Sequence, residues 1–208
     1  MFRDREDAAI RLAKQLMVYQ GRNPLVLAIP RGAVPMAKII ANKLQGEMDV
    51  VLVRKLGAPG NPELAIGAID ETGWAYMTRE AGYIVHDKQY IEKEKSRQLG
   101  IMRERRKRYT PVRPPLDPEG RIVIVVDDGL ATGSTMIAAL HALRARAPRK
   151  LVCAVPVAPP ETLSRVAPYA DEVVCLETPA LFYAVGQFYE VFAQVSDEAV
   201  IALLSDTQ

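Results

Sequence analysis

The sequence predicts an α/β protein built on a doubly wound, mostly parallel sheet with flanking helices. Short uninterrupted apolar runs recur along the chain, as is typical of parallel strands buried on both faces. Segments with apolar residues at helical spacing alternate with these runs. Loops rich in glycine or charge follow several of the runs, and this order of elements favours a parallel sheet covered by helices.

Each predicted element rests on one of these patterns. The apolar runs predict strands over residues 24–29, 49–56, 121–126, 151–157 and 172–176. Helical spacing of alanine, leucine and isoleucine predicts helices over 4–19, 34–44 and 134–147. The carboxyl ends of the first three strands should therefore meet at one edge of the sheet, where such folds bind ligands.

The chain length of 208 residues suits one domain, 1–208, with elaborations. Residues 57–120 are expected to form an insertion with a mobile loop rich in Gly, Pro and Asn at 57–62, which should be neither helix nor regular strand. A short-stranded hairpin over 64–78 and a charged helix over 87–108 should follow it. Residues 177–208 are aromatic-rich, are predicted to be helical and could serve as a small hood.

Composition bounds the class of protein. Apolar residues make up 49% and charged residues 25%, which is ordinary for a globular protein. The formal net charge of +2 is too balanced to indicate nucleic-acid binding. The two cysteines cannot form a disulfide framework, and no run approaches the ~20 apolar residues of a membrane span. We therefore expect a cytoplasmic protein with no membrane contact.

The loop after the third long strand carries the most chemistry. Asp127 and Asp128 stand at the end of the strand, and the small residues 129–135 lead into a helix. Backbone N–H groups and a helix N-terminus suit a phosphate, while the carboxylates suit hydroxyls or a hydrated divalent cation. Neither a P-loop nor a dinucleotide glycine motif is present. The simpler alternative is two solvated acids before a capped helix.

Residues 123–135 resemble the phosphoribosyl pyrophosphate (PRPP) motif of the type I phosphoribosyltransferases. The match covers the whole stretch with one departure, because Gly129 stands where an apolar residue or serine is usual. The sequence of three further segments resembles a bacterial group of such proteins without a settled substrate: Pro30–Pro35, Val53–Gly57 and Pro59–Ile69.

The resemblance implies roles for individual residues. Asp127 and Asp128 would hold the ribose 2′- and 3′-hydroxyls and contact Mg²⁺ through PRPP oxygens or water. The following loop would hold the 5′-phosphate through these residues: Gly129, Ala131, Thr132, Gly133, Ser134 and Thr135.

Three cations are candidates for the pyrophosphate. Arg31 and Gly32 follow the first strand, where the family binds pyrophosphate, often beside a non-proline cis peptide. Arg54 and Lys55 end the second predicted strand, and since neighbouring strand residues point opposite ways, only one should face the site. The alternative for each is an ordinary solvated cation at a turn.

The resemblance implies Mg²⁺-dependent transfer of ribose 5-phosphate from PRPP to a nitrogenous base, with release of pyrophosphate. Ala131 replaces the acid that hypoxanthine-guanine enzymes carry there, so the acceptor base stays open. A PRPP- or nucleotide-sensing protein without catalysis is the main alternative, and a phosphatase with Asp127 as nucleophile is a third. A homodimer is expected only because dimers are common.

Two further features have competing interpretations. The run Arg103–Arg108 is either a solvated helix face or a nucleic-acid contact, and no interleaved aromatic residues favour the latter. The C-terminal aromatic residues, among them Phe182, Tyr189 and Phe192, either pack on the core or stack on an acceptor base.

Overall fold

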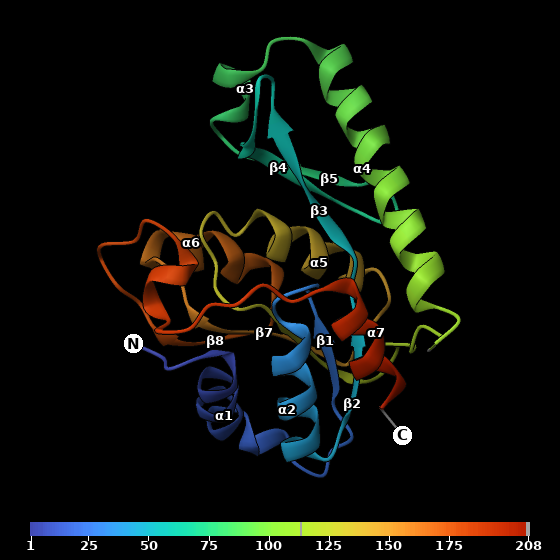
Figure 1. The fold of residues 1–208 in the computed structure, drawn as a ribbon, viewed down its shortest axis with the longest axis vertical. Helices are drawn as coiled ribbons and strands as arrows, with labels where there is room; N and C mark the ends of the chain where they lie inside the picture. The colour runs from blue at the N-terminus through green and yellow to red at the C-terminus, as the bar shows by residue number, and fades with distance from the viewer. Residues whose placement is uncertain (113, 207–208) are drawn as a thin grey trace.

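A computed structural model describes residues 1–112 and 114–206 and contains a five-stranded parallel sheet in the order β2-β1-β6-β7-β8 (Figure 1). Its strands are β1 (Leu25–Ala28), β2 (Glu47–Val50), β6 (Ile122–Val126), β7 (Lys150–Val157) and β8 (Glu172–Glu177). The predicted fold class is thus confirmed. β1 and β6 are buried along their whole length. Strands buried on both faces consist of continuous apolar runs, and for this reason the runs in the sequence predict them.

Helices cover both faces of this sheet. The described helices of the sheet region are α1 (Arg5–Gln15), α2 (Val34–Leu44), α5 (Ser134–Arg144), α6 (Pro160–Val166) and α7 (Asp197–Ser205), with short 3-10 turns at Met17–Tyr19, Ala167–Tyr169 and Val185–Phe188. Figure 1 shows α1 and α2 on one face and α5 and α6 on the other, with α7 beside α2. Alternate residues of β1 and β6 accordingly belong to two separate clusters of buried side chains.

The winding of the sheet reverses at β1. The chain passes from β1 to β2 on one side and returns to place β6 on the other, with Ala28 paired to Val126 in register. The loops after β1 and β6 therefore lie next to each other at the carboxyl edge of the sheet. This is the position at which doubly wound sheets bind their ligands.

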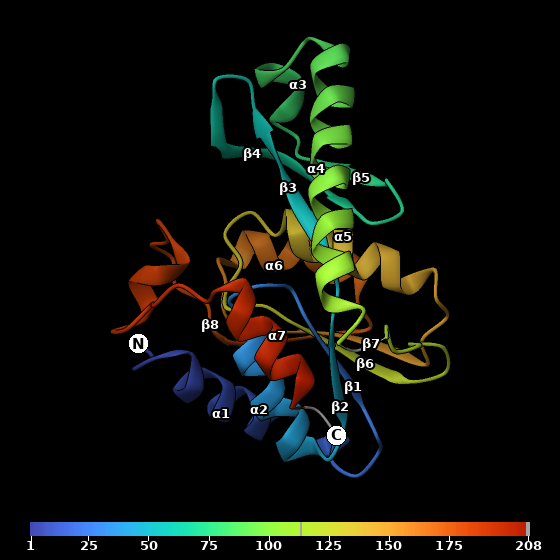
Figure 2. The same ribbon diagram turned by 45° about the vertical axis from the view of Figure 1, so that its right-hand side comes forward.

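A second sheet stands apart from the first. It is antiparallel, with strands β3 (Val53–Ala58), β4 (Asn61–Asp70) and β5 (Ala75–Met77). Together with α3 (Ala81–Ile84) and α4 (Lys88–Tyr109) it forms an extension that projects beyond the carboxyl edge of the parallel sheet (Figures 1 and 2).

Two predictions in this region were wrong. The apolar run 49–56 is not one strand, because the chain leaves the parallel sheet after Val50 and enters the antiparallel sheet at Val53. Val51 and Leu52 remain buried through this change, so apolarity alone could not mark it. Residues 57–62 are also not irregular throughout, since β3 and β4 form a hairpin here whose register is bulged on both sides of Gly57.

The predicted C-terminal helix does not contain the aromatic residues. They lie on a loop with one 3-10 turn over Val185–Phe188, and α7 begins only at Asp197. Phe2 explains this arrangement, because it pairs with Tyr189 through an isolated bridge and its amide donates to the carbonyl of Phe188 at 2.8 Å. We call residues 189–197 the C-terminal strap.

A search of the described residues finds no helix with the length and apolarity that a membrane span requires.

Candidate functional site

Asp127 and Asp128 lie together at the carboxyl end of β6, as the sequence predicts. The backbone amide of Asp128 donates to Oδ1 of Asp127 at 2.9 Å, which orients the Asp127 carboxylate. Burial, followed by the nearby charge of Asp128, raises the pKa of Asp127 well above its ordinary value. Two adjoining carboxylates with little access to water form a site that attracts hydroxyl donors and cations.

Arg5 of α1 is the cationic partner of Asp128. Nη2 of Arg5 lies 2.8 Å from Oδ2 of Asp128, and Nε donates to the same oxygen at 2.9 Å. Burial raises the pKa of Asp128, and the Arg5 charge opposes this shift. The sequence offered no signal for Arg5, since an arginine in the first turn of an N-terminal helix is usually solvated.

The loop after β1 approaches the acids closely. The Pro30–Arg31 peptide is cis, which settles the question that the sequence left open at this loop. A Cβ built on Gly32 would lie 2.2 Å from Oδ2 of Asp128 and 3.1 Å from Nη2 of Arg5. With Asp128 and Arg5 in these positions only a glycine fits here, so Gly32 lies beside Asp128, whereas the guanidinium of Arg31 lies 4.0 Å from Asp197.

The loop Ala131–Thr135 forms a compact turn into α5. The described residues provide no hydrogen-bond acceptor for the amides of Ala131, Thr132 and Gly133. Oγ1 of Thr132 lies 3.1 Å from Oγ of Ser134, and the helix begins at Ser134. Backbone amides that point out of such a turn, together with nearby hydroxyl groups at a helix N-terminus, suit a phosphate group.

α6 supports this loop from behind. Oγ1 of Thr162 donates to the carbonyl of Ala131 at 2.6 Å. Gly133 has φ of +77°, and a Cβ there would lie 2.9 Å from Val166 and 3.0 Å from Thr162. The glycine is therefore required by both its backbone conformation and its contact with α6.

Gly129, the one departure from the motif, has a steric explanation. A Cβ at this position would lie 2.6 Å from Cγ1 of Val185 and 3.0 Å from Cγ1 of Val157. Val185 belongs to the 3-10 turn after β8, so the C-terminal region of this chain occupies the space that a larger residue would need.

Arg54 and Lys55 interact with different groups. Burial raises the pKa of both Asp127 and Asp128, and the positive charge of Lys55 opposes this rise. Arg54 is half-buried against α4, where its Nε donates to Oε1 of Gln98 at 2.8 Å. Burial, together with the nearby Arg105, lowers the pKa of Arg54. Arg54 thus contacts α4, while the charge of Lys55 acts on the two acids.

The C-terminal strap covers the acids. The hydroxyl of Tyr189 donates to the carbonyl of Asp128 at 2.6 Å, and Nη1 of Arg5 donates to the carbonyl of Ala193 at 2.6 Å. The guanidinium of Arg5 also stacks over the Phe192 ring, 3.9 Å from its centroid. Tyr189 and Phe192 are thus fixed by the site itself, whereas Tyr183 is 86% exposed.

The donor set bears on Mg²⁺. Among the described residues no group of three or more His, Cys, Asp and Glu side chains could enclose a metal. Two carboxylates alone fit a magnesium ion whose remaining ligands are phosphate oxygens and water. Asp127 and Asp128 are the residues that would contact such an ion.

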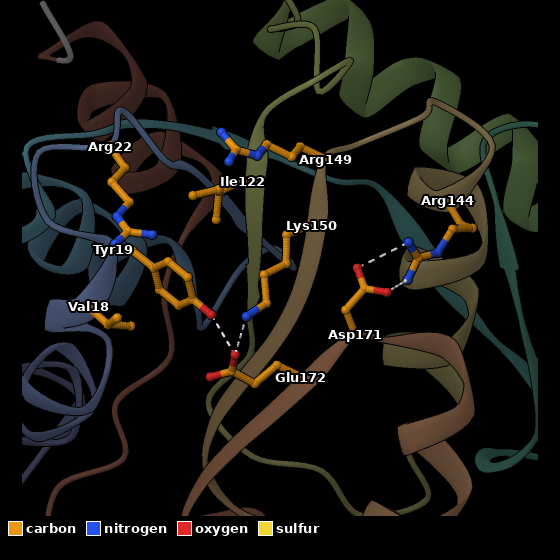
Figure 3. Close-up of a pocket in the computed structure, with 9 residues that line it drawn as sticks. All are labelled: Val18, Tyr19, Arg22, Ile122, Arg144, Arg149, Lys150, Asp171 and Glu172. Carbon is orange, nitrogen blue, oxygen red and sulfur yellow. Dashed lines mark hydrogen bonds and ion pairs between the residues drawn. The ribbon is translucent and has the colours of Figure 1, made fainter.

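A cavity lies at the other end of the sheet and is not part of this site. It has a volume of about 660 Å³ and is lined by Ile122 and Lys150, the first residues of β6 and β7 (Figure 3). Its acids are already paired, because Nζ of Lys150 lies 2.6 Å from Glu172 and Nη2 of Arg144 lies 2.8 Å from Asp171. A full strand length separates it from Asp127.

Comparisons with known proteins identify the family of the chain. Residues 2–192 match the model of the phosphoribosyl transferase domain. The chain is 45% identical over 205 residues to the Mycobacterium tuberculosis protein named "Putative phosphoribosyl transferase Rv0571c", with 98% of this chain and 46% of that protein aligned. The chain thus spans about half the length of the curated relatives it matches.

Among solved structures, TT1426 from Thermus thermophilus is 47% identical to this chain with a TM-score of 0.82, and the alignment covers 99% of this chain and 98% of that one. The family match extends over nearly the whole chain, both β–loop elements of the site included. The chain belongs to the phosphoribosyl transferase domain family.

Proposed function

We propose that this chain transfers ribose 5-phosphate from PRPP to a nitrogenous base and releases pyrophosphate. One observation carries the proposal. Strand β6 is followed first by the carboxylate pair Asp127–Asp128 and then by the loop Ala131–Thr135, which suits a phosphate. The two groups could therefore bind the ribose and the phosphate of one sugar phosphate. The two carboxylates would accept the ribose hydroxyls, and the loop amides would hold the 5′-phosphate.

The proposed reaction breaks the bond between ribose C1 and the pyrophosphate oxygen, and the electron pair leaves with pyrophosphate. Positive charge develops at the ribose, and Asp127 and Asp128 are the nearest carboxylates that could stabilise it. Arg31 and Lys55 would stabilise the negative charge on the departing pyrophosphate, and Arg54 would add a further positive charge. A ring nitrogen of the base then forms the new bond to C1 and loses its proton. Mg²⁺, when bound, would neutralise part of the pyrophosphate charge.

A phosphatase with Asp127 as nucleophile stays an alternative, and hydroxylamine trapping of an aspartyl-phosphate would test it. A sensor that binds PRPP without turning it over would use the same residues. The acceptor base, the cytoplasmic location and a homodimer stay predictions.

Thermal unfolding tests the binding step. Mg²⁺ and PRPP together should raise the midpoint by several degrees when PRPP is near 100 times its Kd, since this adds ~2.7 kcal/mol. The double variant Asp127→Asn/Asp128→Asn should lose the shift. Pyrophosphate release across a panel of bases then separates the enzyme from the sensor, since a sensor would show the shift and no release with any base. No shift from PRPP in the folded wild type would refute the proposal.

A further inference from the structure

Three arginines from separate elements gather at one side of the candidate site. Arg31 follows β1, Arg54 lies on β3 and Arg105 lies on α4. After burial, the nearby charges of Arg105, Arg97 and Arg31 are the causes that lower the pKa of Arg54. Arg54, Arg31 and Arg105 therefore lie within electrostatic reach of one another.

One carboxylate, that of Asp197, lies close to two of these arginines. Oδ2 of Asp197, the first residue of α7, lies 4.0 Å from Nη1 of Arg31, and Oδ1 lies 3.5 Å from Nε of Arg105. The hydroxyl of Tyr109 donates to Oδ1 of Asp197 at 2.8 Å, and Arg108 lies 3.4 Å from Oδ2. Burial opposes ionisation of Asp197, but the Tyr109 hydrogen bond and the charge of Arg105 outweigh it and lower the pKa, so this carboxylate is ionised at neutral pH.

The charges around Asp197 do not balance. Arg54 donates to the neutral Gln98, and the carboxylate of Glu94 nearby is bonded to Arg97. Arg31, Arg105 and Arg108 thus share the single negative charge of Asp197, and Arg54 adds a further positive charge beside them whose hydrogen bond goes to a neutral amide. A ligand with several negative charges would be held more strongly here than one carboxylate, because charge-assisted contacts from guanidinium groups to phosphate are among the stronger hydrogen bonds.

The C-terminal strap connects this cluster to the acids. It begins at Tyr189, which donates to the carbonyl of Asp128, and it ends at Asp197. Figure 2 shows α7 beside the end of α4, where the strap enters the helix. The strap therefore contacts both the acidic side and the cationic side of the site.

We propose that Arg105 is a further pyrophosphate-binding residue and that Asp197 is an internal anion which occupies the same cationic cluster until pyrophosphate displaces it. The inference rests on the proposed function and extends it to α4, whose basic run the motif does not explain. Arg105 is favoured over Arg108 because its side chain is only 16% exposed and it lies close to Arg54, whereas Arg108 is 48% exposed and also pairs with Glu198.

Binding of inorganic pyrophosphate, measured by calorimetry on the full chain, tests both parts. Arg105→Gln should weaken binding by about tenfold or more, as expected for loss of a charge-assisted contact to phosphate. Arg105→Lys should recover part of this affinity, since lysine restores the positive charge but cannot donate two parallel hydrogen bonds as a guanidinium does. The matched control is Arg103→Gln, which removes a charge from the same exposed run of α4 and should change binding less than about twofold.

Asp197→Asn should tighten pyrophosphate binding by about fivefold, since it removes one negative charge beside Arg31 and Arg105. Asparagine still accepts the Tyr109 hydrogen bond, and unfolding midpoints verify that each variant is folded. The matched control is Glu198→Gln, which removes from the same helical turn a charge whose ion pair is with Arg108, and it should leave binding unchanged.

Equal pyrophosphate binding in Arg105→Gln and wild type would overturn the role of Arg105. Weaker binding in Asp197→Asn would overturn the internal-anion role, because it would show that Asp197 orders the arginines for the ligand. Turnover of PRPP is measured separately. A wild type that binds pyrophosphate through Arg105 but does not bind PRPP would refute the proposed function and leave this inference standing.

Discussion

Arg5 places its guanidinium 2.8 Å from the carboxylate of Asp128, and so joins the first helix to the loop that follows β6. Both side chains are largely buried, at 13% and 15% exposure. The pair also connects to the strap through the carbonyl of Ala193. The N-terminal helix and the C-terminal strap therefore meet at the candidate site beside Asp128.

Arg5→Met should destabilise the protein by about 2–4 kcal/mol at pH 7, because it leaves a buried carboxylate without its partner. Urea unfolding measures the change. The double variant Arg5→Met/Asp128→Asn should lose clearly less than the sum of the two single variants, since the unpaired charge is then absent. Arg3→Met, which removes an exposed partner of Asp4, is the control and should have little effect. Additive losses in the double variant would contradict the coupling.

Asp127→Asn should stabilise the unliganded protein at pH 7 and abolish the response to PRPP. The pKa of Asp127 is raised in the folded state, so its contribution to stability is complete below the unfolded value of about 3.8 and is lost as pH rises through the folded pKa. Asparagine carries no charge and still accepts the amide of Asp128. The midpoint difference between variant and wild type should therefore grow with pH and vanish at a pH below that unfolded value.

A matched carboxylate identifies the cause of that stabilisation. Glu119→Gln removes an exposed charge far from the site and should not reproduce the pH dependence. If Asp127→Asn were less stable than wild type at pH 7, the buried carboxylate would be a net stabilising group, and its raised pKa would be wrong.

The sequence predicted the parallel strands and the acidic loop because each is a local pattern. The buried run before Asp127 and the small residues after it define both the strand and its chemistry without reference to other parts of the chain. The same local logic failed at 49–56, where a continuous apolar run passes from one sheet into another. An apolar residue predicts burial, but it does not predict to which of the two sheets the residue belongs.

The partners of the motif could not be predicted for a related reason. Arg5, Tyr189 and Asp197 make contacts between parts of the chain that are far apart in the sequence. An arginine, a tyrosine and an aspartate are common residues in such segments, so the sequence around them gives no signal of these contacts. Arg54 and Lys55 were recognised as candidates, but their division between α4 and the acids depends on where β3 lies. Such features follow from tertiary packing rather than from spacing.

Gly32→Ala should remove PRPP binding and destabilise the protein by about 1–3 kcal/mol, because the new methyl group would force the Asp128 carboxylate away from Arg5. Thermal unfolding with and without PRPP measures both effects. The control is Gly100→Ala in α4, where an added Cβ meets no atom within 4 Å. That variant should be more stable by about 0.5–1 kcal/mol through helix propensity and should keep the PRPP response. A Gly32→Ala protein with normal PRPP binding would show that the loop after β1 can move away from the acids.

Trp74 should control how firmly the extension lies on the sheet. Its ring stacks on His141 of α5, with centroids 3.5 Å apart and planes within 7°, and α5 is the helix that begins at the end of the loop Ala131–Thr135. Trp74→Ala should speed amide hydrogen exchange in β4 and β5, because it removes an aromatic contact worth about 0.5–1.5 kcal/mol beyond its burial. Mass spectrometry of the peptides covering 61–78 measures the change.

The same variant should also alter the fate of PRPP if the extension excludes water from the reacting ribose. A looser cover should increase the release of pyrophosphate in the absence of any base, relative to wild type. Tyr83→Ala is the control, since this aromatic side chain lies on the extension at 86% exposure and should leave both exchange and release unchanged. Faster exchange without greater release would show that the extension moves independently of the reaction. Unchanged exchange would show that contacts other than Trp74 fix it to α5.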